Sequence, residues 1–140
     1  MTRCRFAVIL VLTCVLAGAG SGSAAARDMC FTLPGVAGFV EFALKDFTIP
    51  ATDRCKSVVG FSRTTGWLLE GAACKTADAT TLRLAFAGHP LVAGPTTFQG
   101  GCAIPLPSLT GGSCRGTFGV NPTQGFTSSI SLSICTASVP

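Results

Sequence analysis

Apolar and polar residues alternate along most of the chain after residue 27. In the segment FVEFALKDF, Val40, Phe42 and Leu44 fall on one side of an extended chain. The intervening Glu41 and Lys45 fall on the other side, and the same two-residue period recurs in TTLRLAFAG and FTSSISLSIC. A period of two is typical of a β-strand with one buried face, whereas a helix repeats every three or four residues. The pattern therefore predicts strands and no helix.

Stretches rich in Gly, Pro and Asn separate the alternating runs at LPGVAG, IPATD, SRTTG, KTAD, GHPLVAGP, PLPSLTGG and NPTQG. These residues set the dihedral angles of turns. Short strands at this spacing favour an antiparallel barrel or sandwich over βαβ units. We predict an all-β fold, an antiparallel meander of about eight strands closed as a small barrel, with a two-sheet β-sandwich as the alternative. The expected strands span residues 30–33, 38–47, 55–62, 66–75, 80–87, 97–104, 113–119 and 126–135.

The first 26 residues have the organisation of a secretory signal peptide. Arg3 and Arg5 precede an apolar run from Phe6 to Ala17, and a stretch of small residues ends at Ala26. The apolar run is shorter than the roughly 20 residues that a membrane-spanning helix needs. We expect cleavage after Ala26, secretion to the periplasm or the extracellular space without a stable membrane anchor, and a single domain over residues 27–140. An uncleaved anchor is the alternative.

Secretion changes what the cysteines mean, because thiols become paired in an oxidising compartment. Six cysteines follow the predicted cleavage site, and an even number predicts three disulfides. The intervals between them are 25, 19, 28, 12 and 21 residues, so the tight C-x-x-C pairs typical of zinc sites are absent from the sequence. We therefore expect neither a metal site nor a cofactor.

The strand pattern favours one pairing among the 15 that six cysteines allow. Folding the chain at the midpoints of two predicted hairpins sets cysteines opposite each other, and the remaining pair joins the first strand to the last. In a meander that last bridge implies closure of the sheet. The favoured pairs are Cys55–Cys74, Cys102–Cys114 and Cys30–Cys135. The same arithmetic permits a second set, Cys30–Cys55, Cys74–Cys102 and Cys114–Cys135.

Serines in FTSSISLSIC raise the question of a nucleophile. A serine nucleophile needs a base within hydrogen-bond reach, and His89 is the one histidine in the sequence. It lies in the Gly- and Pro-rich segment AGHPLVAGP, and no G-x-S-x-G motif surrounds a serine. We interpret the serines as the solvent face of a strand, apart from Ser128 on the inner face, and expect no catalytic residues and no enzyme activity. The apolar residues of this segment are expected to face the interior: Phe126, Ile130, Leu132 and Ile134.

A closed barrel of eight strands has an interior that side chains fill or that holds one small ligand. Small residues such as Gly71, Gly100 and Gly116 would make room for a ligand. Glu70 lies in the apolar segment GWLLEGAAC, and a carboxylate on the inner wall would be a ligand candidate. The alternative is that Glu70 faces water beside a Lys or Arg. The candidate ligand-binding residues are Trp67, Glu70, Phe42, Phe86 and Phe118.

The number and distribution of charged residues in the sequence indicate no particular class of partner. Without Arg3 and Arg5, eight basic residues stand against six acidic ones, and the basic residues are spread along the chain rather than clustered as in nucleic-acid-binding proteins. One Trp and no Tyr supply few aromatic rings for stacking on sugars or bases. We expect no nucleic-acid binding.

Two functions remain. The favoured one is a secreted, non-catalytic small β domain with a recognition or structural role. Its partner would be another extracellular protein, contacted through the connection 88–96 and the PLPSLTGG loop. The alternative is a carrier that holds a small apolar molecule in the barrel interior.

Overall fold

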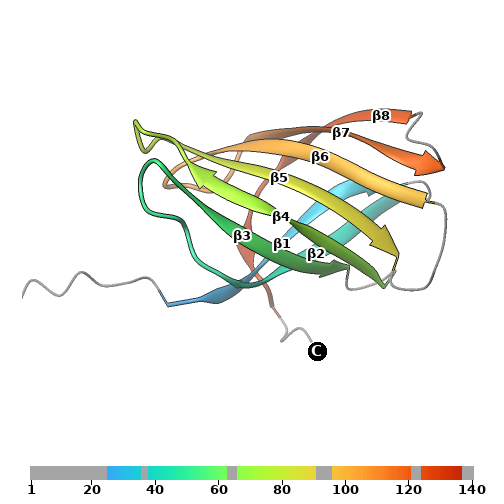
Figure 1. Ribbon diagram of the computed structural model, residues 1–140, viewed down its shortest axis with the longest axis horizontal. Coiled ribbons are helices and arrows are strands. Elements are labelled where there is room, and N and C mark those ends of the chain that lie inside the picture. The colour runs from blue at the N-terminus through green and yellow to red at the C-terminus, as the bar shows by residue number, and fades with distance from the viewer. Residues whose placement is uncertain (1–24, 36–37, 63–65, 91–95, 121–123, 137–140) are drawn as a thin grey trace, which may run out of the picture.

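The computed structural model describes residues 25–35, 38–62, 66–90, 96–120 and 124–136, and these residues are all β (Figure 1). They form one antiparallel sheet with the strand order β8-β7-β6-β5-β4-β3-β2-β1-β9. The predicted all-β antiparallel meander is therefore confirmed. The predicted signal peptide lies almost entirely outside the described residues and stays a prediction. The strands are β1 (Arg27–Gly35), β2 (Gly38–Phe47), β3 (Arg54–Ser62), β4 (Trp67–Lys75), β5 (Thr81–Pro90), β6 (Thr96–Pro105), β7 (Gly112–Val120), β8 (Gln124–Ile130) and β9 (Ser133–Ile134).

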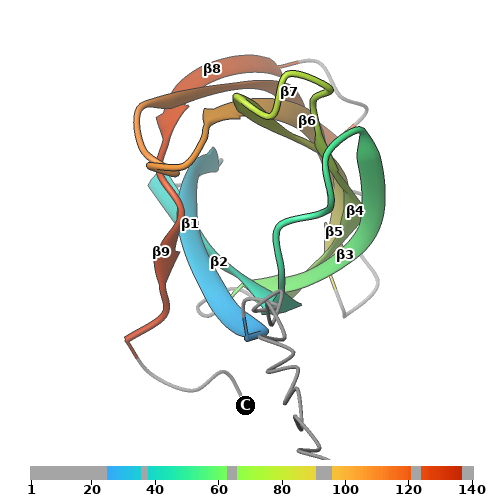
Figure 2. The same ribbon diagram turned by 90° about the vertical axis from the view of Figure 1, so that its left-hand side faces the viewer.

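The sheet curls round on itself into a barrel-like shape (Figure 2). Its two outermost strands, β8 and β9, are consecutive parts of the last segment of the chain, and β8 pairs with β7 while β9 pairs with β1. Between them, the Leu132 N–H donates to the Leu109 carbonyl at 2.8 Å, and the Gly111 N–H donates to Ser131 Oγ at 3.3 Å. The last segment therefore joins the two sides of the sheet. Part of the PLPSLTGG loop is engaged in this junction.

The last strand differs from its prediction. A continuous strand over residues 126–135 is wrong at residues 131 and 132, where pairing changes from β7 to β1. Phe126, Ile130 and Leu132 pack toward the interior as expected. The inward placement of Ile134 is wrong, because beyond the break it pairs with Met29 at the rim and is 54% exposed.

Three disulfides cross-link the sheet, and they are the pairs that the hairpin midpoints favour. Cys55 lies directly opposite Cys74 in the β3–β4 hairpin, and Cys102 lies opposite Cys114 in the β6–β7 hairpin. The third bridge, Cys30–Cys135, ties β1 to the residue after β9. In the chain-entropy description, such cross-links contribute roughly 3 kcal/mol for the short loops and roughly 5 kcal/mol for a loop of about 100 residues.

Phenylalanine rings from six strands pack against one another in the described interior. Neighbouring rings lie with centroids 5.3 to 6.1 Å apart, and four of the five ring pairs are stacked. Aromatic pairs at such separations contribute about 0.5–1.5 kcal/mol beyond the burial of their surface. The rings belong to Phe31, Phe42, Phe86, Phe98, Phe118 and Phe126.

Glycines in the strands make room for these rings. Gly71 and Gly100 are the register partners of Phe86 on its two sides, and Gly116 is the partner of Phe126. A Cβ atom at Gly116 would lie 2.6 Å from Phe126 Cε1, and one at Gly100 would lie 3.2 Å from Phe86 Cε2. The space that these glycines leave is therefore occupied by the protein's own rings.

Candidate functional site

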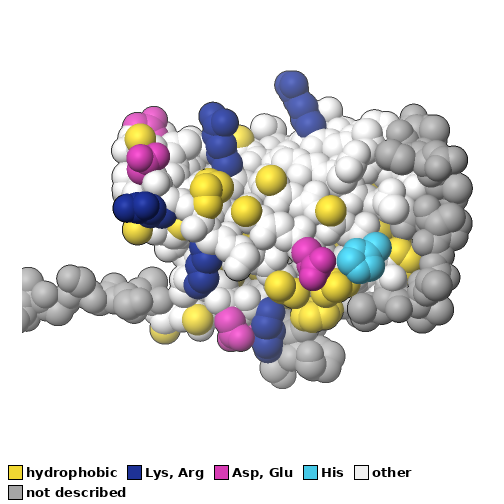
Figure 3. All heavy atoms as spheres, in the orientation of Figure 1, with side chains coloured by type: hydrophobic (Ala, Val, Ile, Leu, Met, Phe, Trp, Pro, Cys, Tyr) yellow, Lys and Arg dark blue, Asp and Glu magenta, His cyan; other side chains and the backbone are white. Residues whose placement is uncertain are grey.

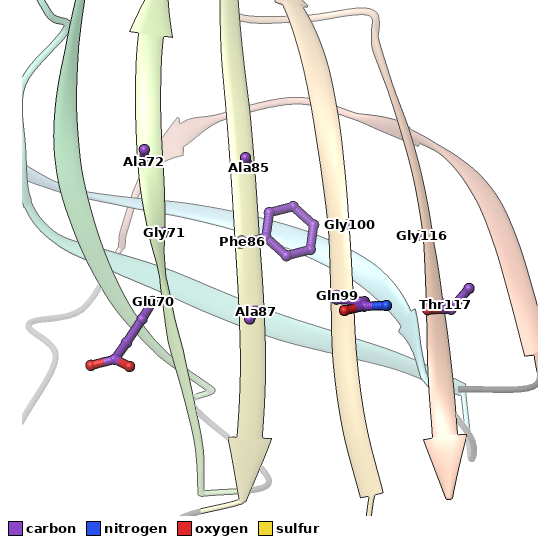
Figure 4. Close-up of a pocket in the computed structure, with 10 residues that line it drawn as sticks. All are labelled: Glu70, Gly71, Ala72, Ala85, Phe86, Ala87, Gln99, Gly100, Gly116 and Thr117. Carbon is purple, nitrogen blue, oxygen red and sulfur yellow. The ribbon is translucent and has the colours of Figure 1, made fainter. Parts of the chain in front are cut away.

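Small side chains cover the outer face of strands β4 to β7. Because long side chains stand only at the margins of this face, it carries two adjoining shallow and widely open depressions of about 720 and 520 Å³ that share Ala72 and Ala85. We call this continuous depression the outer trough, and Figure 4 shows the residues of its larger part. The small outward residues that form its floor are Ala72, Ala85, Ala87, Gly101 and Ala103.

Two arginines border one end of the outer trough. Arg83 on β5 lies opposite Ala103 of β6, and Gly101 of β6 lies opposite Arg115 of β7. The arginines are thus two strand spacings apart across the sheet and two residues apart along it, about 12 Å in all, with small residues between them. Ser113 lines the same end of the trough. Figure 3 shows separate Lys and Arg side chains projecting from this face of the molecule.

Neither arginine has an acidic partner within the described residues. The ion pair that these residues contain is Lys45–Asp28 at 3.3 Å, on β1 and β2. Asp78 in the β4–β5 turn is engaged locally, because its carboxylate accepts hydrogen bonds from the Thr76 hydroxyl and, at 3.1 Å, from the Thr80 N–H. These bonds, the Thr76 hydroxyl first, hold the pKa of Asp78 below its usual value of 3.8. The positive charge at this end of the trough is therefore open to an outside anion.

Polar side chains border the other end of the outer trough. Glu70, Gln99 and Thr117 occupy outward positions there, on β4, β6 and β7 (Figure 4). Thr117 Oγ1 is buried and has no hydrogen-bond partner among the described residues. A buried hydroxyl without a partner destabilises the folded state by roughly 1–3 kcal/mol. Thr117 Oγ1 is thus a hydrogen-bonding group beside this end of the trough that the described residues leave unused.

The structure separates the five predicted ligand-binding residues. Phe42, Phe86 and Phe118 are 2%, 6% and 6% exposed within the core, and Trp67 packs against that core partly buried. Glu70 is exposed on the outer face, in agreement with the alternative prediction from the sequence that its carboxylate faces water. No ion pair joins it to a Lys or Arg of the described residues. Glu70 alone of the five lines the outer trough, and their roles in ligand binding stay predictions.

His89 and the serines are not brought together. His89 lies exposed on the outer face of β5, and Ser128 and Ser129 lie on β8, three strand spacings or about 14 Å across the sheet. Ser128 Oγ donates to the Ser129 carbonyl at 3.0 Å, and Ser131 Oγ accepts a backbone hydrogen bond in the barrel junction. The described residues contain no group of three or more His, Cys, Asp or Glu arranged to hold a metal ion.

An apolar groove of about 400 Å³ lies at the barrel rim. Met29 and Phe47 form buried parts of it, and Ile49 and Ile134 are 39% and 54% exposed along it. Leu109 of the PLPSLTGG loop completes the wall. We call this feature the rim groove.

Comparison with known proteins does not identify the function of this site. No protein-family model, no curated protein and no solved structure matches the chain. In the part of the chain that the structure describes, no helix has the length and apolar character needed to cross a membrane.

The arginine pair is the feature that reasoning from the sequence missed. Arg83 and Arg115 are far apart in the chain, and their spread along it suggested no partner. In a meander, however, outward residues of alternate strands come close on the same face when they lie at similar levels along their strands. The predicted hairpin register could have revealed the pair. A register that sets Cys102 opposite Cys114 also sets Arg115 opposite Gly101, and the strand that carries Gly101 pairs with the strand that carries Arg83.

Proposed function

We propose that this chain is an exported, non-catalytic recognition domain that binds its partner in the outer trough. The observation that carries the proposal is the contrast between the two faces of the sheet. The described interior is packed with stacked phenylalanine rings, whereas the outer face of β4 to β7 presents a depression with unpaired charge. Ligand sites in proteins combine a concave surface with a few convergent polar groups.

Export is supported by the cysteines. Three intramolecular disulfides are typical of proteins that fold in an oxidising compartment. The arrangement of charged, apolar and small residues before Ala26 supports the same proposal.

A non-catalytic role is supported by the distance between His89 and the serines of the last segment. Glu70 and His89 are diagonal neighbours on β4 and β5, but the serines of the last segment lie on β8 or beyond it, and no hydrogen bond among the described residues links them to His89 or Glu70. A nucleophile and its base must lie within hydrogen-bond reach of each other, or approach it.

Site-specific photocrosslinking tests the proposal. A benzophenone side chain at Ala87 sits on the floor of the trough, and one at the exposed Thr32 of β1 serves as the control on another part of the barrel. Irradiation in the extracellular fraction of the protein's own host is expected to give a covalent adduct from position 87 and none from position 32. Adducts from position 32 alone, or equal adducts from both positions, would contradict the proposal.

The rim groove favours a second candidate, binding of a small apolar molecule. This differs from the sequence-based carrier hypothesis, since the ligand would lie against Ile49 and Ile134 at the rim rather than between the phenylalanine rings. Titration with a fluorescent fatty acid tests it. Saturable binding that Ile134→Asp abolishes would support this candidate, and the absence of saturable binding would refute it.

A further inference from the structure

Arg83 and Arg115 are arranged to hold an anion. Both side chains are exposed, both border the same end of the outer trough, and the residues between them on β6 are Gly101 and Ala103. Because this floor is low, the two guanidinium groups can reach toward a common ligand. Guanidinium groups bind carboxylate, sulfate and phosphate groups through paired N–H donors. Neither arginine is neutralised by an acidic residue of the described structure.

The rest of the trough offers hydrogen bonds to neutral hydroxyl groups. Glu70 accepts, Gln99 donates and accepts, and the unpartnered Thr117 hydroxyl does both. These groups lie two outward positions along the strands from Arg83, about 14 Å, whereas Thr117 is one outward position from Arg115, about 7 Å. A ligand that reaches both ends of the trough is therefore elongated, with negative charge at one end and hydroxyl groups along its length.

We propose that the outer trough binds an acidic oligosaccharide, with Arg83 and Arg115 holding its carboxylate or sulfate groups and Thr117 bonding one of its hydroxyls. The proposal rests on the proposed function and names the chemical class of its partner. Recognition here depends on charge and hydrogen bonds, so it needs no aromatic platform.

Two other anionic partners fit the trough less well. An acidic peptide gains most of its affinity by adding a strand to a free sheet edge, whereas β4 to β7 each have neighbours on both sides. A protein interface also uses large anchors such as Trp and Tyr, and the floor of the trough is Ala and Gly. A lipid surface would need apolar side chains beside the arginines. Among the described residues, the most exposed large apolar side chains, Phe39 and Ile134, lie on β2 and β9 instead.

Calorimetric titration of the disulfide-linked protein with a heparin hexasaccharide tests the proposal. The double variant Arg83→Gln/Arg115→Gln is expected to bind at least about tenfold more weakly in low-salt buffer, because each lost guanidinium removes charge-assisted hydrogen bonds. The control Arg27→Gln/Lys45→Gln removes the same charge on the other side of the barrel and is expected to bind like the wild type. Thr117→Val is expected to weaken binding by roughly threefold to tenfold, and Thr117→Ser to retain it.

Three outcomes would overturn the proposal. The first is equal loss of affinity in the two double variants, which would indicate nonspecific attraction of charge. The second is binding of a hexaglutamate peptide or of anionic vesicles at least as tight as that of the hexasaccharide. The third is an affinity that Thr117→Val leaves unchanged. If any of these occurs while the Ala87 photoadduct still forms, the proposed function stands and the identity of the ligand is wrong. If the adduct is also missing, both are wrong.

Discussion

Replacement of Gly116 by alanine tests whether strand glycines make room for the aromatic core. A Cβ atom at this position would lie 2.3 Å from the Gln99 carbonyl oxygen and 2.6 and 2.7 Å from two atoms of the Phe126 ring. Ordinary contact begins near 3.4 Å, so the oxygen must retreat by about 1 Å, the difference between 3.4 and 2.3 Å. Overpacking of this kind costs about 1–3 kcal/mol. Alanine also stabilises by restricting the unfolded chain, by about 0.4–1 kcal/mol. We therefore expect a net destabilisation of about 1 kcal/mol, and a fall in Tm of roughly 4 °C.

Urea unfolding followed by circular dichroism, under non-reducing conditions, gives the free energy of unfolding. Gly125→Ala is the matched control, because it lies in the paired strand β8 and a Cβ atom there would meet nothing closer than 3.8 Å. It is expected to be neutral or slightly stabilising. In a Phe126→Leu background the cost of Gly116→Ala should shrink, since the ring clash is removed and the clash with Gln99 remains. A Gly116→Ala variant as stable as Gly125→Ala would refute the reasoning, as would a cost that Phe126→Leu leaves unchanged.

Three further predictions concern single groups. Thr117→Val is expected to raise the free energy of unfolding by about 1–2 kcal/mol in urea unfolding, because it removes a buried hydroxyl without a partner; an unchanged or lower stability would contradict the assignment. The pKa of Asp78, followed by NMR titration, should lie below 3.8 and rise toward it in Thr76→Val. Since a lowered folded-state pKa stabilises only above the unfolded value, this contribution is present above about pH 4 and fades as pH falls through the folded pKa; no shift in Thr76→Val would refute it. Under limiting dithiothreitol, differential alkylation should find Cys55–Cys74 reduced first, because Cys55 is exposed and Arg83 lies opposite Cys74, where it would stabilise the departing thiolate. Cys102–Cys114 is buried and should be reduced last; the reverse order would contradict this.

The sequence predicted the hairpins closely because the register of a hairpin depends on residues that can be recognised in the sequence. Alternation and turn residues fix each midpoint, and the midpoint then determines which residues face each other, as for Cys55 and Cys74. The strand break at residues 131 and 132 could not be recognised in this way, because apolar and polar residues continue to alternate through it. It arises from a change of pairing partner, and the contacts that hold it come from the distant Leu109 and Gly111.

The candidate site was harder to predict than the fold. Alternation places Glu70 on one face of its strand, but the side of the barrel to which that face belongs depends on the packing of the whole sheet. Likewise, Gly71, Gly100 and Gly116 were expected to make room for a ligand, since alternation places Phe86 and Phe126 inward but does not show that their rings lie over Gly100 and Gly116. The arginine pair emerges when three strands are laid side by side.

The most direct test of the account is an NMR titration of the protein's methyl groups with the heparin hexasaccharide. The account holds that the barrel interior is filled by the protein's own side chains and that binding takes place on the outer face of β4 to β7. It predicts shifts at the methyl groups of Ala72, Ala85, Ala87 and Ala103, which line the outer trough, with the buried methyl groups of Leu82, Ile104 and Ile130 unchanged. Shifts confined to the buried methyl groups would contradict it.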